Sequence, residues 1–151
     1  MKKTAFVLAL ALLSFPAAAD EQGVAEARAA SFKAFDADGD GKASAAELVA
    51  GTKSVFSALD ADSSGSASLE EFQAVSLGYL TLAEKDGKTD AYKAARAEIF
   101  ARFDTNDDKQ LNESEVIAGV LEDYFTAAGA SVTFENYGSS MFISKMEQSL
   151  K

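Results

Sequence analysis

The sequence of 151 residues contains no cysteine, no histidine and no tryptophan, and it has a single proline. Without cysteine the chain forms no disulfide, thiolate zinc site or iron–sulfur cluster, and it has no thiol nucleophile. Without histidine it lacks an imidazole metal ligand, a histidine general base and a Ser-His-Asp triad. The remaining ligand atoms are carboxylate, amide, hydroxyl and backbone oxygens, which are the ligands that hard cations prefer.

Basic residues are also scarce. The 14 Lys and Arg residues stand against 24 Asp and Glu residues, so the formal net charge is −10. This charge argues against nonspecific binding to nucleic acid or to an anionic lipid surface. The apolar share of 48% is sufficient for a core, and the length suits one compact domain or two very small ones.

The N-terminus has the three-part pattern of a bacterial secretory signal peptide. Lys2 and Lys3 precede an apolar stretch over residues 5–15, Pro16 ends the stretch, and small residues fill positions 17–19. The stretch is too short to cross a bilayer, which takes about 20 apolar residues. We therefore predict a signal peptide over 1–19, export to the periplasm or the cell exterior, and a mature domain over 20–151 with no membrane span.

Three acidic segments of equal length recur in the rest of the chain, over residues 36–47 (loop 1), 60–71 (loop 2) and 104–115 (loop 3). Each carries oxygen-bearing side chains at positions 1, 3 and 5 and a glutamate at position 12. Apolar residues flank each segment four residues and one residue before it, and directly after it. This spacing places them on one face of a helix, so the predicted unit is helix, acidic loop, helix.

The repeated unit resembles the EF-hand family over nearly all of residues 20–151. The resemblance implies an all-α fold of paired EF-hand helix-loop-helix units in one compact domain, with short β-bridges between the loops. It also implies calcium, which takes about six to eight oxygen ligands in a flexible shell. Alternate side chains, the backbone carbonyl at position 7 and the glutamate at position 12 supply such oxygens. Position 6 turns sharply, which glycine does without steric cost.

The loops match this pattern to different degrees. Loop 1 matches it fully, whereas loop 2 has a neutral serine at position 5, so we expect weaker binding there. Loop 3 has Lys109 at position 6, and a lysine with positive φ costs on the order of 1 kcal/mol. With the position-7 carbonyl given last for each loop, the predicted ligands are Asp36, Asp38, Asp40, Glu47 and Lys42, then Asp60, Asp62, Ser64, Glu71 and Ser66, then Asp104, Asn106, Asp108, Glu115 and Gln110.

A fourth unit lacks the ligand set. Residues 131–137 resemble the second half of a loop, and placing Val132 at position 8 puts Phe125 at position 1 and Asn136 at position 12. No carboxylate cage results, so we predict no metal there and a purely structural role in pairing. The alternative is an unrelated helical tail.

The spacing of the loops limits how they pair. Only residues 48–59 separate loops 1 and 2, and a helix of that length spans about 18 Å, so loops at its two ends cannot bridge each other. The segment between loops 2 and 3 predicts a helix over about 69–83, a turn over 84–89 and a helix over about 90–103.

Two half-units, about 20–83 and 90–151, are therefore expected to dock. In one scheme loop 2 pairs with loop 3, and loop 1 pairs with the fourth unit. In the other scheme loop 1 pairs with loop 3, and loop 2 pairs with the fourth unit. Position 8 is alanine in the first two loops, but Leu111 and Val132 in the last two, so small side chains would face large ones.

These features favour an exported calcium-binding protein, a buffer or modest sensor, and not an enzyme. Nearly all paired carboxylates lie in the loops, and neither a Gly-rich phosphate loop nor a Gly-x-Ser-x-Gly elbow occurs. We expect two or three calcium ions, with magnesium as a competitor at loop 1. The alternative is an envelope interaction module that binds one unidentified protein partner and holds structural calcium. The apolar residues of 137–146 pack the core or line a groove, and we favour the core.

Overall fold

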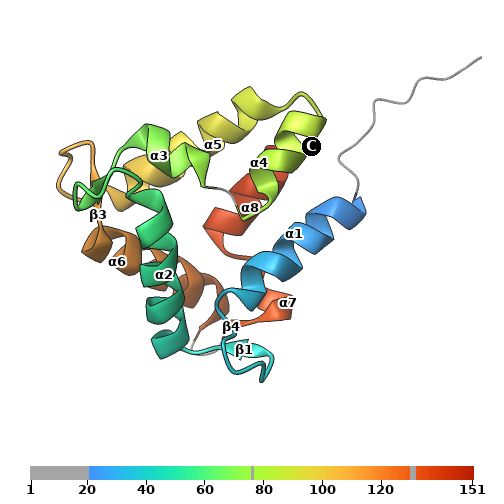
Figure 1. The fold of residues 1–151 in the computed structure, drawn as a ribbon. Helices are drawn as coiled ribbons and strands as arrows, with labels where there is room; N and C mark the ends of the chain where they lie inside the picture. Colours follow the sequence, from blue (N-terminus) through green and yellow to red (C-terminus); the bar gives the residue numbers. More distant parts are fainter. Residues whose placement is uncertain (1–20, 76, 130–131) are drawn as a thin grey trace, which may run out of the picture.

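The computed structural model describes residues 21–75, 77–129 and 132–151, and the predicted signal peptide over 1–19 lies outside these ranges. Helices dominate the described chain and the strands are short bridges, which confirms the predicted all-α class (Figure 1). The elements in chain order are α1 (Glu21–Lys33), β1 (Lys42–Ala43), α2 (Ala45–Leu59), β2 (Ser66–Ala67), α3 (Leu69–Ala74), α4 (Tyr79–Lys85), α5 (Thr89–Phe103), β3 (Leu111–Asn112), α6 (Glu113–Ala128), β4 (Val132–Thr133), α7 (Phe134–Tyr137) and α8 (Met141–Gln148).

The short strands decide between the two pairing schemes. Strand β1 pairs antiparallel with β4, and β2 pairs antiparallel with β3, so loop 1 meets the fourth unit and loop 2 meets loop 3. The two sheets lie at opposite ends of α2 (Figure 1), as the length of that helix requires. In the register, Ala43 faces Val132 and Ala67 faces Leu111, so a small side chain faces a large one in both buried bridges.

A shared capping device starts the helix that follows each loop. In loop 1 the Ser44 hydroxyl accepts from the N–H of Glu47 at 3.3 Å, while Glu47 Oε2 accepts from the N–H of Ser44 at 2.9 Å. The same reciprocal box forms at Ser68 with Glu71 and at Asn112 with Glu115. Each box satisfies two backbone donors that the first helical turn would leave unpaired. The glutamate at position 12 therefore also fixes the start of its helix.

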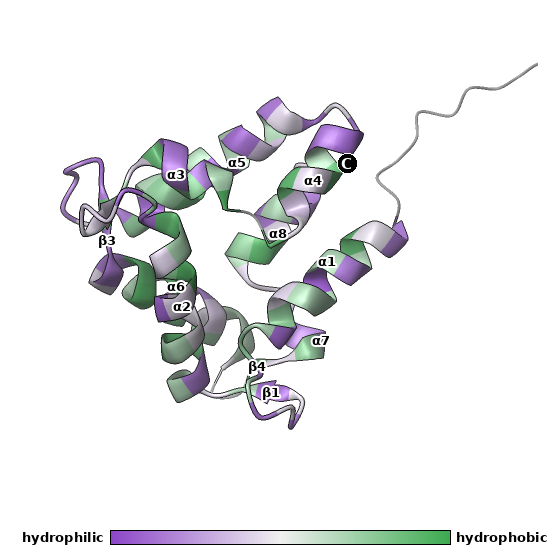
Figure 2. Ribbon diagram, in the orientation of Figure 1, coloured by the Kyte–Doolittle hydropathy of each residue, from purple (hydrophilic) through white to green (hydrophobic). Residues whose placement is uncertain are grey.

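One hydrophobic core joins the two halves of the chain. The flanking positions of loop 1 supply Phe32 and Phe35, and the edge of the Phe32 ring contacts Tyr137 at 5.3 Å between centroids. Tyr137 also stacks on Tyr124 at 5.0 Å. Figure 2 shows hydrophilic residues gathered in the loops beside β1 and β3, with hydrophobic residues on the helices between them.

The C-terminal apolar residues pack as expected. Tyr137, Ile143 and Met146 are fully buried, and Met141 and Phe142 are partly buried against the same core. None of the helices within the described ranges is both long and apolar enough to cross a bilayer.

The structure differs from the sequence prediction in the segment between loops 2 and 3. The single helix expected over about 69–83 is divided into α3 and α4, with Leu77 at φ 48° and Gly78 at φ 97° between them. The break leaves the carbonyl of Phe72 outside the helical ladder, and the Arg96 guanidinium donates to it instead. Helix α5 begins at Thr89, close to its expected start.

The fourth unit keeps only the second half of a loop. Val132 pairs with Ala43, as the assigned position 8 predicts. Thr133 is the N-cap of α7, and its N–H donates to the side chain of Asn136 at position 12. Phe125, assigned to position 1, instead lies within α6, which continues to Ala128 and ends at Gly129. Without carboxylates to organise a loop, the apolar helical pattern continues and packs on the core.

Candidate metal-binding sites

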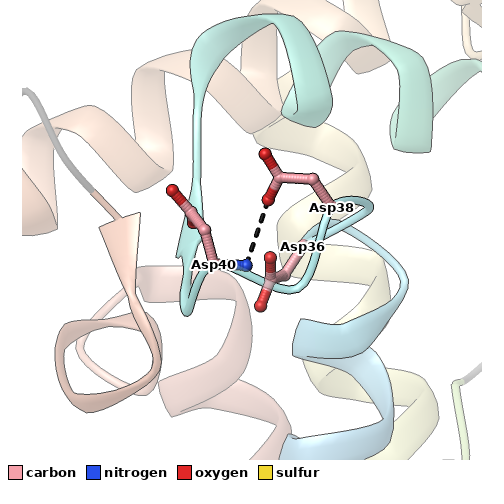
Figure 3. A group of neighbouring side chains, drawn as sticks. All are labelled: Asp36, Asp38 and Asp40. Atoms are coloured by element: carbon pink, nitrogen blue, oxygen red, sulfur yellow. Dashed lines mark hydrogen bonds between the residues drawn. The ribbon is translucent and has the colours of Figure 1, made fainter.

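The loop between α1 and β1 gathers three carboxylates. Asp36, Asp38 and Asp40 offer oxygen atoms that all lie within 4.8 Å of one another (Figure 3). The N–H of Gly41 donates to Asp36 Oδ2 at 3.1 Å, and the N–H of Asp40 donates to Asp38 Oδ1 at 3.1 Å. Asp36 Oδ1 is buried and has no hydrogen-bond partner among the described residues. A buried acceptor without a partner is costly, and a bound cation would remove that cost.

Loop 2 repeats this arrangement with a different carboxylate trio. Asp60, Asp62 and Glu71 also offer oxygens within 4.8 Å of one another. The N–H of Gly65 donates to Asp60 Oδ2 at 3.0 Å, at the same two loop positions as in loop 1. Ser64, in place of a third aspartate, donates its hydroxyl to the carbonyl of Ser66 at 2.9 Å. This loop therefore places fewer charges near its centre than loop 1.

Loop 3 has the same backbone turn without the glycine. Lys109 adopts φ 64°, in the region where Gly41 and Gly65 lie at 85° and 91°, and its N–H donates to Asp104 Oδ2 at 3.0 Å. Asp107, at position 4, also has positive φ, at 61°. A side chain in this region is sterically disfavoured, so the loop is formed at the cost that its sequence predicts.

The oxygen atoms of loop 3 are arranged less tightly. Asn106 donates its amide N–H to Asp108 Oδ2 at 3.0 Å. Among the described residues, the carboxylates of loop 3 do not form a trio as close as those of loops 1 and 2. Thr105 donates its hydroxyl to Glu115 Oε1 at 3.2 Å, a contact that the sequence analysis missed. The signal was a hydroxyl at position 2, where loops 1 and 2 have alanine.

The glutamate at position 12 ties together the two ends of its loop. Glu47 Oε1 accepts from the N–H of Ala37 at 3.0 Å, and Oε2 accepts from the Ser44 hydroxyl at 2.7 Å. The Ser44 hydroxyl and then its backbone N–H lower the pKa of Glu47 to about 2. The backbone N–H and hydroxyl of Ser68 likewise lower the pKa of Glu71. Both carboxylates are therefore ionised at neutral pH.

The predicted carbonyl ligands lie where the loops enter the sheets. Lys42 and Ser66 begin β1 and β2, and Gln110 directly precedes β3. Gln110 donates its N–H to Asp108 Oδ1 at 2.8 Å, and Lys42 donates its N–H to Asp40 Oδ1 at the same distance. These backbone contacts shape the segments that carry the predicted carbonyl ligands.

The donor sets fit a hard divalent cation. They consist of ionised carboxylates, amide and hydroxyl oxygens and backbone carbonyls, and loop 1 adds the unpaired oxygen of Asp36. In loop 1 the residues that would hold the ion are the carboxylate trio, Glu47, which lies outside that trio, and the carbonyl of Lys42. In loop 2 they are the carboxylate trio, Ser64 and the carbonyl of Ser66. In loop 3 the corresponding residues are Asp104, Asn106, Asp108 and Glu115, with the carbonyl of Gln110.

Comparison with known families agrees with this geometry. The family model described as EF hand matches two adjacent segments, residues 28–50 and 52–76, which contain loops 1 and 2. No curated protein and no solved structure matches the chain. The family implies calcium binding and is typically not catalytic. Residues 28–50 and 52–76 are thus EF-hand segments, each with a carboxylate trio in a capped loop, and they support the EF-hand family for this chain.

Proposed function

We propose that the protein is an exported calcium-binding protein that acts as a buffer or modest sensor, without catalysis. The observation that carries the proposal is the trio of Asp36, Asp38 and Asp40, in which one buried carboxylate oxygen has no hydrogen-bond partner among the residues that the structure describes. An oxygen-only site with ionised carboxylates and flexible geometry suits calcium better than magnesium, which demands a strict octahedron and retains its waters.

The three loops are expected to differ in affinity. Loop 1 has four carboxylates and glycine at both left-handed positions, so it binds most tightly and is where magnesium competes. Loop 2 has one charge fewer, and loop 3 has the strained Lys109. Two or three ions therefore bind, depending on loop 3.

Buffering is favoured over broad target sensing. A sensor opens an apolar groove, and such grooves are rich in methionine because that side chain adapts to many partners. Here Met146 is fully buried in the core and Met141 is partly buried against it. This packing supports a protein that binds ions without presenting a large apolar surface.

Export is proposed from the signal pattern of residues 1–19, with Asp20 as the first residue of the mature domain of two docked half-units. EF-hand modules outside cells work with dissociation constants of around 10⁻⁴–10⁻³ M. We expect affinities in this range or somewhat tighter.

Calorimetric calcium titration of metal-free protein in millimolar magnesium tests the proposal. Two or three saturable sites are expected, and the single substitutions Glu47→Gln, Glu71→Gln and Glu115→Gln should each weaken one of them. Absence of saturable binding would overturn the proposal. A metal-free protein that is unfolded and folds only with calcium would instead favour the interaction module with structural calcium.

A further inference from the structure

A small cavity lies in the core, and its lining residues lie outside the calcium loops, although several of them directly flank a loop. It has a volume of about 40 Å³, and its walls come from α2, α3, α5, α6 and α8, from Phe35 after α1, and from Val75 and Leu77 between α3 and α4. Most of the lining is aliphatic or aromatic, including Val55, Phe103, Val116 and Val120. Two polar side chains, Thr52 and Arg96, interrupt this apolar lining.

Arg96 is a buried cation that forms no ion pair with any carboxylate of the described residues. It is 3% exposed, and it is the sole Lys or Arg side chain buried within the described ranges. The Nε and Nη2 groups donate to the carbonyl of Phe72, and the guanidinium lies 3.7 Å from the centroid of the Phe72 ring. The ion pairs found among the described residues involve other cations.

The buried carboxylates of the described chain are engaged elsewhere. Asp123 accepts from the N–H groups of Met141 and Phe142 at the start of α8, and Glu115 accepts from the backbone of loop 3. Burial lowers the pKa of Arg96 to about 10, so the guanidinium stays charged at neutral pH. A buried charge without a counter-charge is strongly destabilising, and this one borders a cavity.

Thr52, from α2, supplies a second polar group to the cavity lining. Its side chain is 2% exposed, and its Oγ1 has no hydrogen-bond partner among the described residues. A hydroxyl can both donate and accept a hydrogen bond. A guanidinium has five N–H donors, and in Arg96 only the Nε and Nη2 groups donate to the carbonyl of Phe72. An oxyanion entering the cavity could use both residues.

We propose that this cavity binds a small monocarboxylate, such as acetate or propionate, through the Arg96 guanidinium and the Thr52 hydroxyl. The planar fork of arginine matches a carboxylate, and the apolar walls suit a short carbon chain. The size limits the ligand to a few heavy atoms, since one water molecule needs about 10–15 Å³ of such cavity volume. None of the residues that line this site is a predicted calcium ligand.

The test is thermal denaturation of the purified protein with sodium acetate, propionate or butyrate, against sodium chloride and acetamide at matched concentration and ionic strength. Metal is removed on a chelating resin, because soluble chelators are themselves polycarboxylates. We expect a saturable rise in Tm with acetate or propionate and none with acetamide. The ¹H–¹⁵N signal of the Arg96 side chain should shift with the same dissociation constant.

Variants locate the site. Arg96→Met should weaken binding by at least about tenfold, as expected for the loss of a charge-assisted hydrogen bond. Thr52→Val keeps the shape and should weaken binding severalfold, and it decides the test if Arg96→Met does not fold. Arg102→Met is the matched control, since that exposed arginine on the same helix should leave binding unchanged.

Several results would overturn the proposal. These are no saturable carboxylate binding, an equal effect of chloride, or unchanged affinity in Thr52→Val together with Arg96→Met. The calcium titration of the same variants separates this outcome from any failure of the calcium sites, because neither residue lies in a loop.

Discussion

The backbone of loop 3 offers a direct test of local strain. Lys109 has φ 64° and an exposed side chain, so its substitution changes backbone strain and charge but removes little packing. The left-handed region costs a non-glycine residue about 1–2 kcal/mol. Glycine in turn raises the conformational entropy of the unfolded chain, which costs about 0.4–1 kcal/mol. Lys109→Gly should therefore raise the free energy of unfolding by about 0.5–1 kcal/mol.

Urea denaturation of metal-free protein measures this difference. With an m-value of about 1.5–2 kcal/mol per M, the midpoint should rise by about 0.3–0.6 M. Lys109→Gln is the matched control, since it removes the charge and keeps the strained side chain. The reciprocal change Gly41→Ala should lower stability by a similar amount, because no atom lies within 4 Å of the added Cβ and only φ 85° opposes it. If Lys109→Gly is no more stable than Lys109→Gln, the strain argument is wrong.

Three further predictions concern the rest of the fold. Ser44→Ala should raise the pKa of Glu47 from about 2 in a carbon-detected NMR titration. Because the pKa of Glu47 in the folded state lies below the ordinary 4.5, the ionised carboxylate stabilises the fold above pH 4.5, and this contribution is lost as the pH falls toward 2. The free energy of unfolding of the variant should therefore depend less on pH in this range. Arg28→Ala should lower the free energy of unfolding, measured in urea, by about 1–3 kcal/mol. The substitution removes two hydrogen bonds to Glu147, of 2.6 and 2.5 Å, and leaves that carboxylate partly buried. An unchanged denaturation midpoint would refute this. Gly119→Ala should destabilise the protein by about 1–3 kcal/mol, although alanine favours helices. The reason is that the new Cβ would lie 2.5 Å from Phe103 Cγ. A variant that is more stable would contradict the close packing of α6 on Phe103.

The sequence was most informative in the loops, where the same twelve-residue pattern of oxygen-bearing side chains repeats. The helix and loop positions follow from the twelve-residue period, and the structure places three carboxylates of loop 1 and three of loop 2 close together. The pairing of Ala43 with Val132 agrees with the expected match of small and large side chains. These features are local, or depend on a single pair of residues.

The sequence was less informative where tertiary contacts override local preference. Gly78, which adopts φ 97°, was a local signal for the break between α3 and α4 that the sequence analysis did not use. What the sequence could not show is that Arg96, from another helix, satisfies the carbonyl of Phe72 that the break exposes. The extension of α6 through Phe125 likewise depends on packing against the core. The buried, unpaired position of Arg96 could not be predicted, because helical periodicity alone does not show which charge faces a cavity.

Crystals grown in calcium, with anomalous difference maps, test the central claim most directly. The account predicts peaks enclosed by the carboxylates of loops 1 and 2, a third and weaker peak in loop 3, and none between α6 and β4. Strong diffraction with no peak at the trio of Asp36, Asp38 and Asp40 would contradict it.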